Sequence, residues 1–174
     1  DHFYETTAHP GGVVGSDDVV IVKVNNQWGG LGDGAGVGRL ATSTDVLKGL
    51  IWRVLQHPEG FTGEVVVAEN TQYVMANYDI APANAQDQDQ SYADVVAAFA
   101  GLGYPVSTVI WDYLNDSLLD GGTVGGPVPP GEYASGDATD GYLLVEDPAG
   151  SGADELSYPK FQTPGGHFVS LRHG

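Results

Sequence analysis

The first part of the chain alternates between short apolar runs and amphipathic segments. The runs 19–24 and 64–68 predict buried strands, because each is short, largely β-branched and bounded by turn-forming residues. Between them, apolar residues recur at helical spacing over 46–55, after the capping pattern of Thr42 and Asp45. The sequence therefore predicts a strand, helix, strand unit with parallel strands and a right-handed crossover.

The same order of elements repeats further along the chain. Ser91 and Asp94 form a second capping pattern before an amphipathic segment, and the apolar run 106–111 follows it. Three strands and two helices in alternation predict an α/β fold with a doubly wound, mainly parallel sheet. We expect a single domain over 1–174, with its βαβαβ core in 1–112.

From residue 113 onward the chain is rich in Gly, Pro and Asp. This composition predicts a loop-rich extension over 113–174 without long helices. Within it, 141–145 is a predicted strand, and 157–162 with 167–172 form a predicted hairpin around the turn 164–166. The extension is thus expected to add β structure to the α/β core.

Charge narrows the range of partners. The chain has 23 acidic and 6 basic residues, a net charge of −17, and it has no Lys or Arg between Arg53 and Lys160. Nucleic acids are bound mainly through Lys and Arg that displace counterions, so this composition argues against nucleic acid as a partner. No apolar run approaches the roughly 20 residues of a membrane-spanning helix. Salt screening or divalent cations would relieve the self-repulsion, which favours a saline or extracellular setting.

The chain contains no cysteine, which excludes disulfides, thiolate metal sites and cysteine nucleophiles. It opens at Asp1 without a basic region followed by an apolar stretch. We therefore expect that an export signal has been removed or was never present. The predicted localisation is extracellular or secreted.

Several stretches resemble one known family along nearly the whole chain. The segments that carry the resemblance are 19–25, 42–45, 57–70, 140–142, 157–161 and 170–174. They are similar to the exported branch of the uncharacterised family called domain of unknown function 362. Proteins of that branch usually continue into a second half with a Pro-x-Leu-Lys-x-His segment. The resemblance therefore implies a processed fragment, or a short form whose second half comes from a partner chain.

The carboxyl ends of the predicted strands carry the candidate functional residues. In open parallel sheets, ligands bind at this edge, where loops and helix N-termini converge. The candidate ligand-binding residues are Asn26, Trp28, Thr44, Asp45, Asn70 and Trp111. Lys23, Glu69 and Asp112 are the candidates for acid–base catalysis. Asp45, Glu69 and Asp112 also offer oxygen ligands for a divalent cation, calcium or magnesium.

Each of these residues also has a structural interpretation. Strand-end turns and helix caps favour the same Asn and Asp side chains. Lys23 either pairs with Glu69 or Asp112, or lies exposed on an edge strand. Trp28 and Trp111 either stack on a sugar ring or pack in the core.

Two motifs near this edge are incomplete. The loop 30–35 fits the dinucleotide-binding fingerprint, but the helix begins too late after it, and a glycine-rich lid is the alternative. Asp87, Asp89 and Ser91 have the spacing of the first ligands of a calcium loop, but Tyr92 replaces its turn glycine. The alternative to a calcium loop is that these acidic residues cap the following helix or are simply solvated.

Two functional hypotheses follow. In the first, the chain is an extracellular α/β domain that binds a small ligand or a divalent cation at the carboxyl ends of its strands, with or without catalysis. In the second, it is a non-catalytic structural or filament-forming subunit. The second hypothesis requires self-association, in which edges of the Gly- and Pro-rich part pair with neighbouring copies.

Overall fold

The computed structural model describes residues 2–24, 42–69, 85–110, 126–128, 141–146 and 155–170. The chain divides into two compact units, Asp1–Val109 and Ile110–Gly174, and each is described by itself. Among the described residues, neither helix is both long and apolar enough to cross a membrane.

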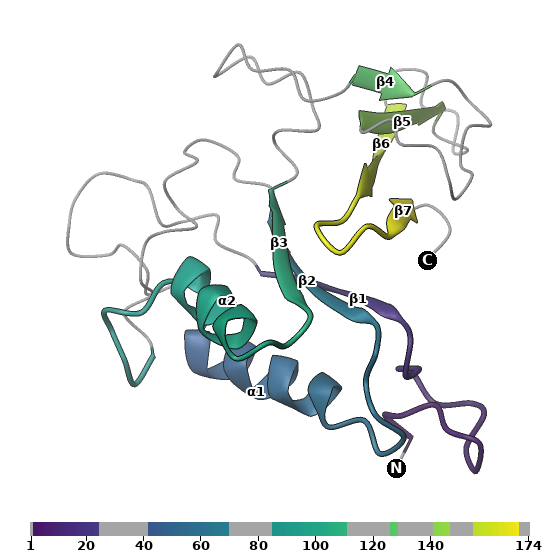
Figure 1. The fold of residues 1–174 in the computed structure, drawn as a ribbon. Coiled ribbons are helices and arrows are strands. Elements are labelled where there is room, and N and C mark those ends of the chain that lie inside the picture. Colours follow the sequence, from purple (N-terminus) through teal and green to yellow (C-terminus); the bar gives the residue numbers. More distant parts are fainter. Residues whose placement is uncertain are drawn as a thin grey trace. The chain divides into compact units, whose positions relative to one another are not determined.

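A three-stranded parallel sheet forms the centre of the first unit (Figure 1). Its strands, in spatial order, are β1 (Val19–Lys23), β2 (Glu64–Glu69) and β3 (Val106–Ile110). In the parallel register of the first pair, Val19 lies opposite Glu64 and Lys23 lies opposite Ala68. The predicted α/β core with its three parallel strands is confirmed, and β1 and β2 end at the same edge of the sheet.

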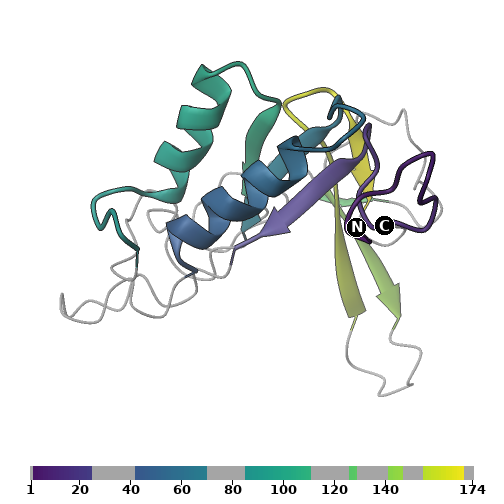
Figure 2. The same ribbon diagram turned by 90° about the horizontal axis from the view of Figure 1, so that it is seen from below.

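Two helices, α1 (Thr44–Leu55) and α2 (Tyr92–Gly101), connect the strands. Both lie on the same face of the sheet and contact each other (Figure 1 and Figure 2). This arrangement follows from the strand order, because two right-handed crossovers that step in the same direction place their helices on one face. A doubly wound sheet needs a helix on the second face, and that part of the predicted fold class stays a prediction.

The core of the first unit centres on β2, the middle strand. Val65, Val66, Val67 and Ala68 are all fully buried, although their side chains alternate between the two faces of the sheet. From the helical layer, α1 contributes a buried stripe at the spacing of one helix face: Thr44, Leu47, Ile51 and Val54. Of the apolar positions that predicted this helix, Leu47, Ile51 and Val54 are buried, whereas Val46 and Leu50 are exposed.

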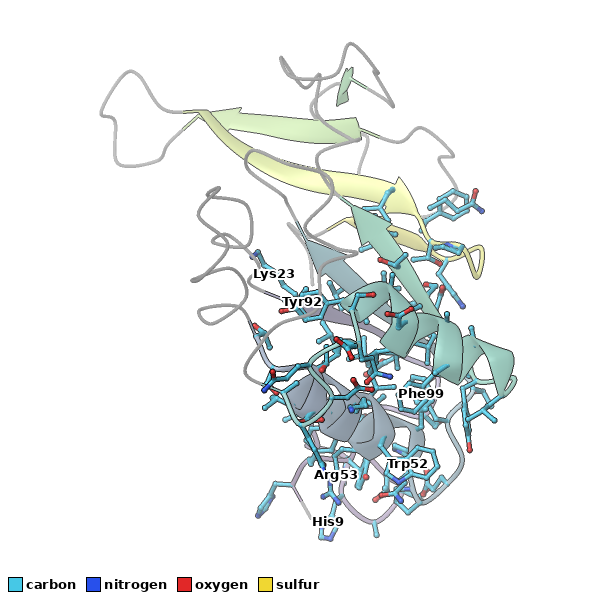
Figure 3. The ribbon with its side chains drawn as sticks, turned by 90° about the vertical axis from the view of Figure 1, so that its left-hand side faces the viewer. His9, Lys23, Trp52, Arg53, Tyr92 and Phe99 are labelled. Carbon is cyan, nitrogen blue, oxygen red and sulfur yellow. The ribbon has the colours of Figure 1, made fainter. Side chains whose placement is uncertain are left out.

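An aromatic cluster lies near the C-terminal ends of the two helices. Trp52 of α1 lies 6.2 Å from the ring of Phe99 in α2 and 5.7 Å, edge to face, from Tyr104 (Figure 3). Trp52 is 43% exposed, so the cluster lies partly at the surface. Aromatic pairs in this geometry add about 0.5–1.5 kcal/mol beyond their buried area.

The second unit contains a four-stranded sheet. In spatial order its strands are β4 (Gly126–Val128), β5 (Gly141–Glu146), β6 (Glu155–Gln162) and β7 (Phe168–Ser170). Adjacent strands from β5 to β7 are antiparallel, whereas β4 pairs with β5 in parallel. β6 and β7 lie where the sequence predicts a hairpin, and Gly166 in the connecting turn has φ of 90°. β4 was not predicted, because Gly126 and Pro127 favour turns.

Candidate functional site

The carboxyl edge of the parallel sheet is where both helices begin. Lys23 and Ala68 lie opposite each other near the ends of β1 and β2. Tyr92, the first residue of α2, donates its hydroxyl to the main-chain carbonyl of Thr42, just before α1, over 2.5 Å. The starts of the two helices are thereby joined at this edge, and Figure 3 shows Lys23 and Tyr92 at the same end of the sheet.

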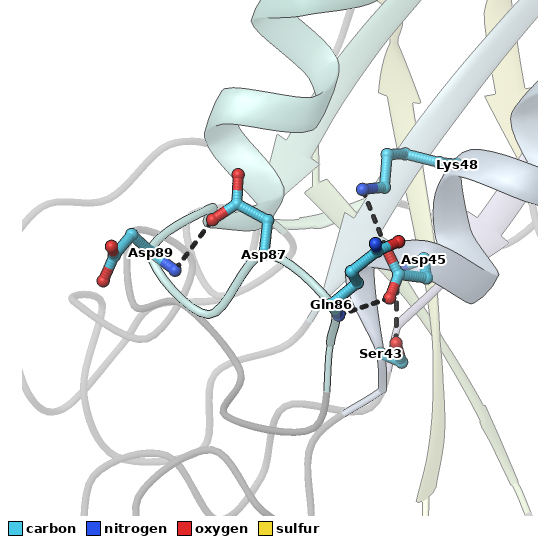
Figure 4. A network of polar contacts seen from close by, with 6 residues as sticks. All are labelled: Ser43, Asp45, Lys48, Gln86, Asp87 and Asp89. Carbon is cyan, nitrogen blue, oxygen red and sulfur yellow. Dashed lines mark hydrogen bonds and ion pairs between the residues drawn. The ribbon is translucent and has the colours of Figure 1, made fainter.

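Asp45 attaches α1 to the segment that precedes α2 (Figure 4). One carboxylate oxygen, Oδ2, accepts the main-chain N–H of Gln86 over 2.6 Å, and Oδ1 lies 2.8 Å from Nζ of Lys48. The hydrogen bond from Lys48, followed by that from Gln86, holds the pKa of Asp45 below its usual value. Both oxygens of this predicted metal ligand therefore already have protein partners.

The two helices begin differently. At α2 the predicted capping box is confirmed: Ser91 Oγ accepts the N–H of Asp94, whose carboxylate accepts the N–H of Ser91 over 2.9 Å. At α1 the predicted cap is wrong by one residue, since the N-cap is Ser43, whose hydroxyl oxygen accepts the N–H of Asp45. The physical reason is that Asp45 turns toward Lys48 and Gln86 and does not reach back to close a box.

Thr44, the first residue of α1, carries an unusual hydroxyl group. The residue has no exposed surface, and its Oγ1 has no hydrogen-bond partner among the described residues. It belongs to the buried stripe that continues with Leu47, so its side chain lies on the sheet side of the helix. A buried hydroxyl without a partner costs about 1–3 kcal/mol, and such groups are rare in native proteins. Thr44 therefore marks a polar position that the described residues do not satisfy.

A second shielded polar atom lies near the start of α2. Oε1 of Gln90, one residue before the N-cap Ser91, is hidden from solvent and has no hydrogen-bond partner among the described residues. Buried side-chain oxygens of this kind are normally satisfied by protein groups, ordered water or a ligand. Within the residues that the structure describes, the carboxyl edge therefore carries an unsatisfied polar group beside each helix start.

The other predicted site residues fall into two groups. Lys23 is exposed at the end of β1 and alternates with the buried Val22 and Val24. Glu69 is the last residue of β2. The remaining candidates lie outside the described residues: Asn26, Trp28, Asn70, Trp111 and Asp112. The loop 30–35 lies outside them as well.

The acidic residues before α2 do not form a cation site in the described structure. The main-chain N–H of Asp89 donates to Oδ1 of Asp87 over 3.1 Å, and both residues are exposed. Across the described ranges, no three or more His, Asp or Glu side chains come together in a way that would hold a metal ion. A bound calcium or magnesium ion at Asp45, Glu69 and Asp112 stays a prediction.

The sequence did not indicate a hollow at the opposite, amino edge of the sheet. This hollow of about 480 Å³ is lined by Glu5, Thr6, Thr7, Pro10, Gly15, Ser16, Asp17, Asp18 and Glu59. Two of its carboxylates hold main-chain N–H groups: Glu59 accepts that of Thr7 over 2.9 Å, and Asp18 accepts that of Gly15 over 2.7 Å. Glu59 thereby holds the N-terminal segment from 52 positions along the chain, whereas Asp18 closes a local turn three positions after Gly15.

His57 stabilises the same region. It is buried, its Nε2 lies 2.8 Å from the carbonyl of Glu5, and its Nδ1 accepts the main-chain N–H of Glu59. This pair of contacts requires the neutral ring with its proton on Nε2. Nearby, Tyr4 donates its hydroxyl to the carbonyl of Arg53 over 2.6 Å, and burial raises the pKa of Tyr4. We assign this cluster a structural role.

Comparison with known proteins adds no functional information. No protein-family model, curated protein or solved structure matches this chain. The resemblance to the exported branch of domain of unknown function 362 stays a prediction. A functional proposal must therefore rest on the geometry of the carboxyl edge.

Proposed function

We propose that this chain is an α/β domain that binds a small ligand at the carboxyl edge of its three-stranded sheet. The observation that carries the proposal is the fully buried hydroxyl of Thr44 at the start of α1, which has no hydrogen-bond partner in the described part of the chain. Protein interiors seldom leave such a group unsatisfied, so a ligand group is the partner that we assign to it.

The location supports the proposal independently of Thr44. Parallel sheets place the ends of their strands and the starts of their helices at one edge, which is the usual ligand position in open α/β folds. In this chain the two helix starts are joined by the contacts from Tyr92 to Thr42 and from Gln86 to Asp45. A ligand at this edge would therefore meet a fixed framework.

The proposal can be tested by thermal unfolding in the presence of separate probes. The probes are inorganic phosphate, calcium chloride, magnesium chloride and glucose, each compared with sodium chloride at matched ionic strength. A ligand that binds only the folded state stabilises it by about 1.4 kcal/mol when its concentration is roughly tenfold above Kd. We expect at least one probe to raise the Tm, and the proposal fails if none does.

The substitution Thr44→Val locates the site. It keeps the shape of the side chain and removes the hydroxyl, so the unliganded protein should keep its stability or gain slightly. The stabilisation by the active probe should be lost. The matched control is Thr62→Val, at the opposite end of β2, where the hydroxyl donates to the carbonyl of Ser16 over 3.2 Å. This control should leave probe binding unchanged.

We propose further features of the protein together with this function. They are a doubly wound sheet, a single domain over 1–174, an extracellular location, catalysis by Lys23, Glu69 and Asp112, and a divalent cation as cofactor. The alternative function is a structural or filament-forming subunit, alone or with a partner chain. Light scattering at several salt concentrations distinguishes this alternative from the ligand-binding function, because a strictly monomeric particle contradicts assembly.

A further inference from the structure

The starts of the two helices differ in how they satisfy their main-chain N–H groups. The first N–H groups of any α-helix lack partners inside the helix and carry the positive end of its dipole. At the start of α2, the carboxylate of Asp94 accepts hydrogen bonds from both the N–H and the hydroxyl of Ser91. The start of α2 is therefore closed by the protein's own anion.

Among the described residues, no anion lies at the start of α1 as Asp94 does at the start of α2. The position that Asp94 occupies in α2 is occupied in α1 by Val46, an apolar residue that is 64% exposed. The side-chain oxygen of the cap residue Ser43 accepts the N–H of Asp45, and its main-chain carbonyl accepts that of Leu47. Within the described part of the chain, the N–H groups of Thr44 and Val46 are therefore left for an external acceptor.

The described carboxylate in the first turn of α1 is already paired. Asp45 lies in the first turn of α1, but its two oxygens contact Lys48 at 2.8 Å and the N–H of Gln86 at 2.6 Å. The paired charge weakens the repulsion that an isolated carboxylate would exert on an incoming anion. The first turn of α1 thus combines a free positive helix end with a compensated acidic side chain.

Thr44 adds a third donor at the same place. Its hydroxyl is buried, has no hydrogen-bond partner among the described residues and belongs to the first residue of the helix. The hydroxyl can donate to an oxygen anion, and the main-chain N–H groups of the helix start favour an anion over a metal cation. The net charge of −17 repels polyanions, so the fitting ligand is small and carries one anionic group.

We propose that the start of α1 binds a small oxyanion, the phosphate or carboxylate group of the ligand, through the Thr44 hydroxyl and the N–H groups of Thr44 and Val46. This inference rests on the proposed function and specifies its ligand class. In the apo protein an ordered water is the competing occupant of the same position.

The test uses isothermal titration of the full chain with sodium phosphate and, separately, sodium acetate, at matched ionic strength. The two arms distinguish a phosphate site from a carboxylate site. Thr44→Val should weaken binding of the active anion at least tenfold, whereas Thr44→Ser, which keeps the hydroxyl, should stay within about threefold of the wild type. Circular dichroism and Tm of each variant establish that it is folded.

A second variant addresses the main-chain donors. Val46→Pro removes one N–H in the first helical turn, where proline costs no internal hydrogen bond. It should also weaken anion binding at least tenfold, and the control Thr62→Val should have no effect. Equal anion affinity in wild type, Thr44→Val and Val46→Pro would overturn the inference, because the anion would then bind elsewhere.

The outcomes also separate this inference from the broader proposal. If glucose or calcium binds and Thr44→Val abolishes that binding, while phosphate and acetate do not bind, the carboxyl-edge site stands and the oxyanion is refuted. If no probe binds at all, both fail. If the partner of the Thr44 hydroxyl is only an ordered water, no probe is expected to bind.

Discussion

The hydroxyl of Tyr92 lies 2.5 Å from the main-chain carbonyl of Thr42, to which it donates a hydrogen bond across 50 positions of sequence. Tyr92 is fully buried and begins α2, whereas Thr42 immediately precedes the N-cap of α1. This single contact therefore joins the two helix starts on which the proposed site is built.

Removal of that hydroxyl should loosen the carboxyl edge. We expect Tyr92→Phe to lower the free energy of unfolding by about 1–2 kcal/mol, because the carbonyl of Thr42 then loses one hydrogen-bond donor. For a chain of this length the loss corresponds to a fall in Tm of roughly 2–8 °C, measured by thermal denaturation. The control is Tyr104→Phe in the aromatic cluster, which should change the Tm little. Equal effects of the two substitutions would contradict the role of the Tyr92 contact.

The burial pattern of α1 gives a prediction within one helix. Ile51 is fully buried, whereas the neighbouring Leu50 is 38% exposed. Ile51→Ala should cost about 2–5 kcal/mol of unfolding free energy through lost burial and a cavity against the sheet. Leu50→Ala should cost less than about 1 kcal/mol. Urea denaturation of both variants measures the difference, and a larger loss for Leu50→Ala would show that the helix faces the other way.

Two glycines give opposite expectations. A Cβ at Gly63 would lie 1.9 Å from the main-chain oxygen of Asp18, so the chain would have to move. Gly63→Ala should therefore destabilise the protein by about 1–3 kcal/mol or more. Gly49 lies inside α1 with open space around it, and Gly49→Ala should stabilise the helix by about 1 kcal/mol. Chemical denaturation measures the free energy of unfolding of both variants. Destabilisation by Gly49→Ala would contradict the position of Gly49 inside α1 with open space around it.

The capping box of α2 predicts a dependence on pH. The N–H of Ser91, and then its hydroxyl, lower the pKa of Asp94 by hydrogen bonding to its carboxylate. A carboxyl group whose pKa is lower in the folded state stabilises that state above its unfolded pKa of about 3.9. This contribution is lost as the pH falls through the lowered pKa. We therefore expect Asp94→Asn to reduce the Tm at pH 6 and to have almost no effect near pH 2.

The measurement compares the Tm of wild type and Asp94→Asn between pH 2 and pH 7. Asp89→Asn is the matched control, because it removes the same charge from an exposed side chain in the segment before the helix. A gap between wild type and Asp94→Asn that is the same at every pH would show that the carboxylate charge does not stabilise the cap.

Local patterns in the sequence determined the elements of the first unit. The β-branched runs became β1 and β2, the apolar period of 46–55 became the buried stripe of α1, and Ser91 with Asp94 became a complete capping box. These features depend on residues within a few positions of one another. Backbone periodicity and capping act over that same distance, so they can be predicted without knowledge of the fold.

Only the tertiary structure decided which side chains are satisfied and by whom. The N–H of Gln86 donates to one oxygen of Asp45 from 41 positions away, and Glu59 accepts the N–H of Thr7 across 52. The buried hydroxyl of Thr44 has no hydrogen-bond partner within the described ranges. The residue type at each of these positions is compatible with several environments. Whether a polar group meets water, protein or a ligand depends on which distant segment packs against it, and local sequence patterns do not encode that choice.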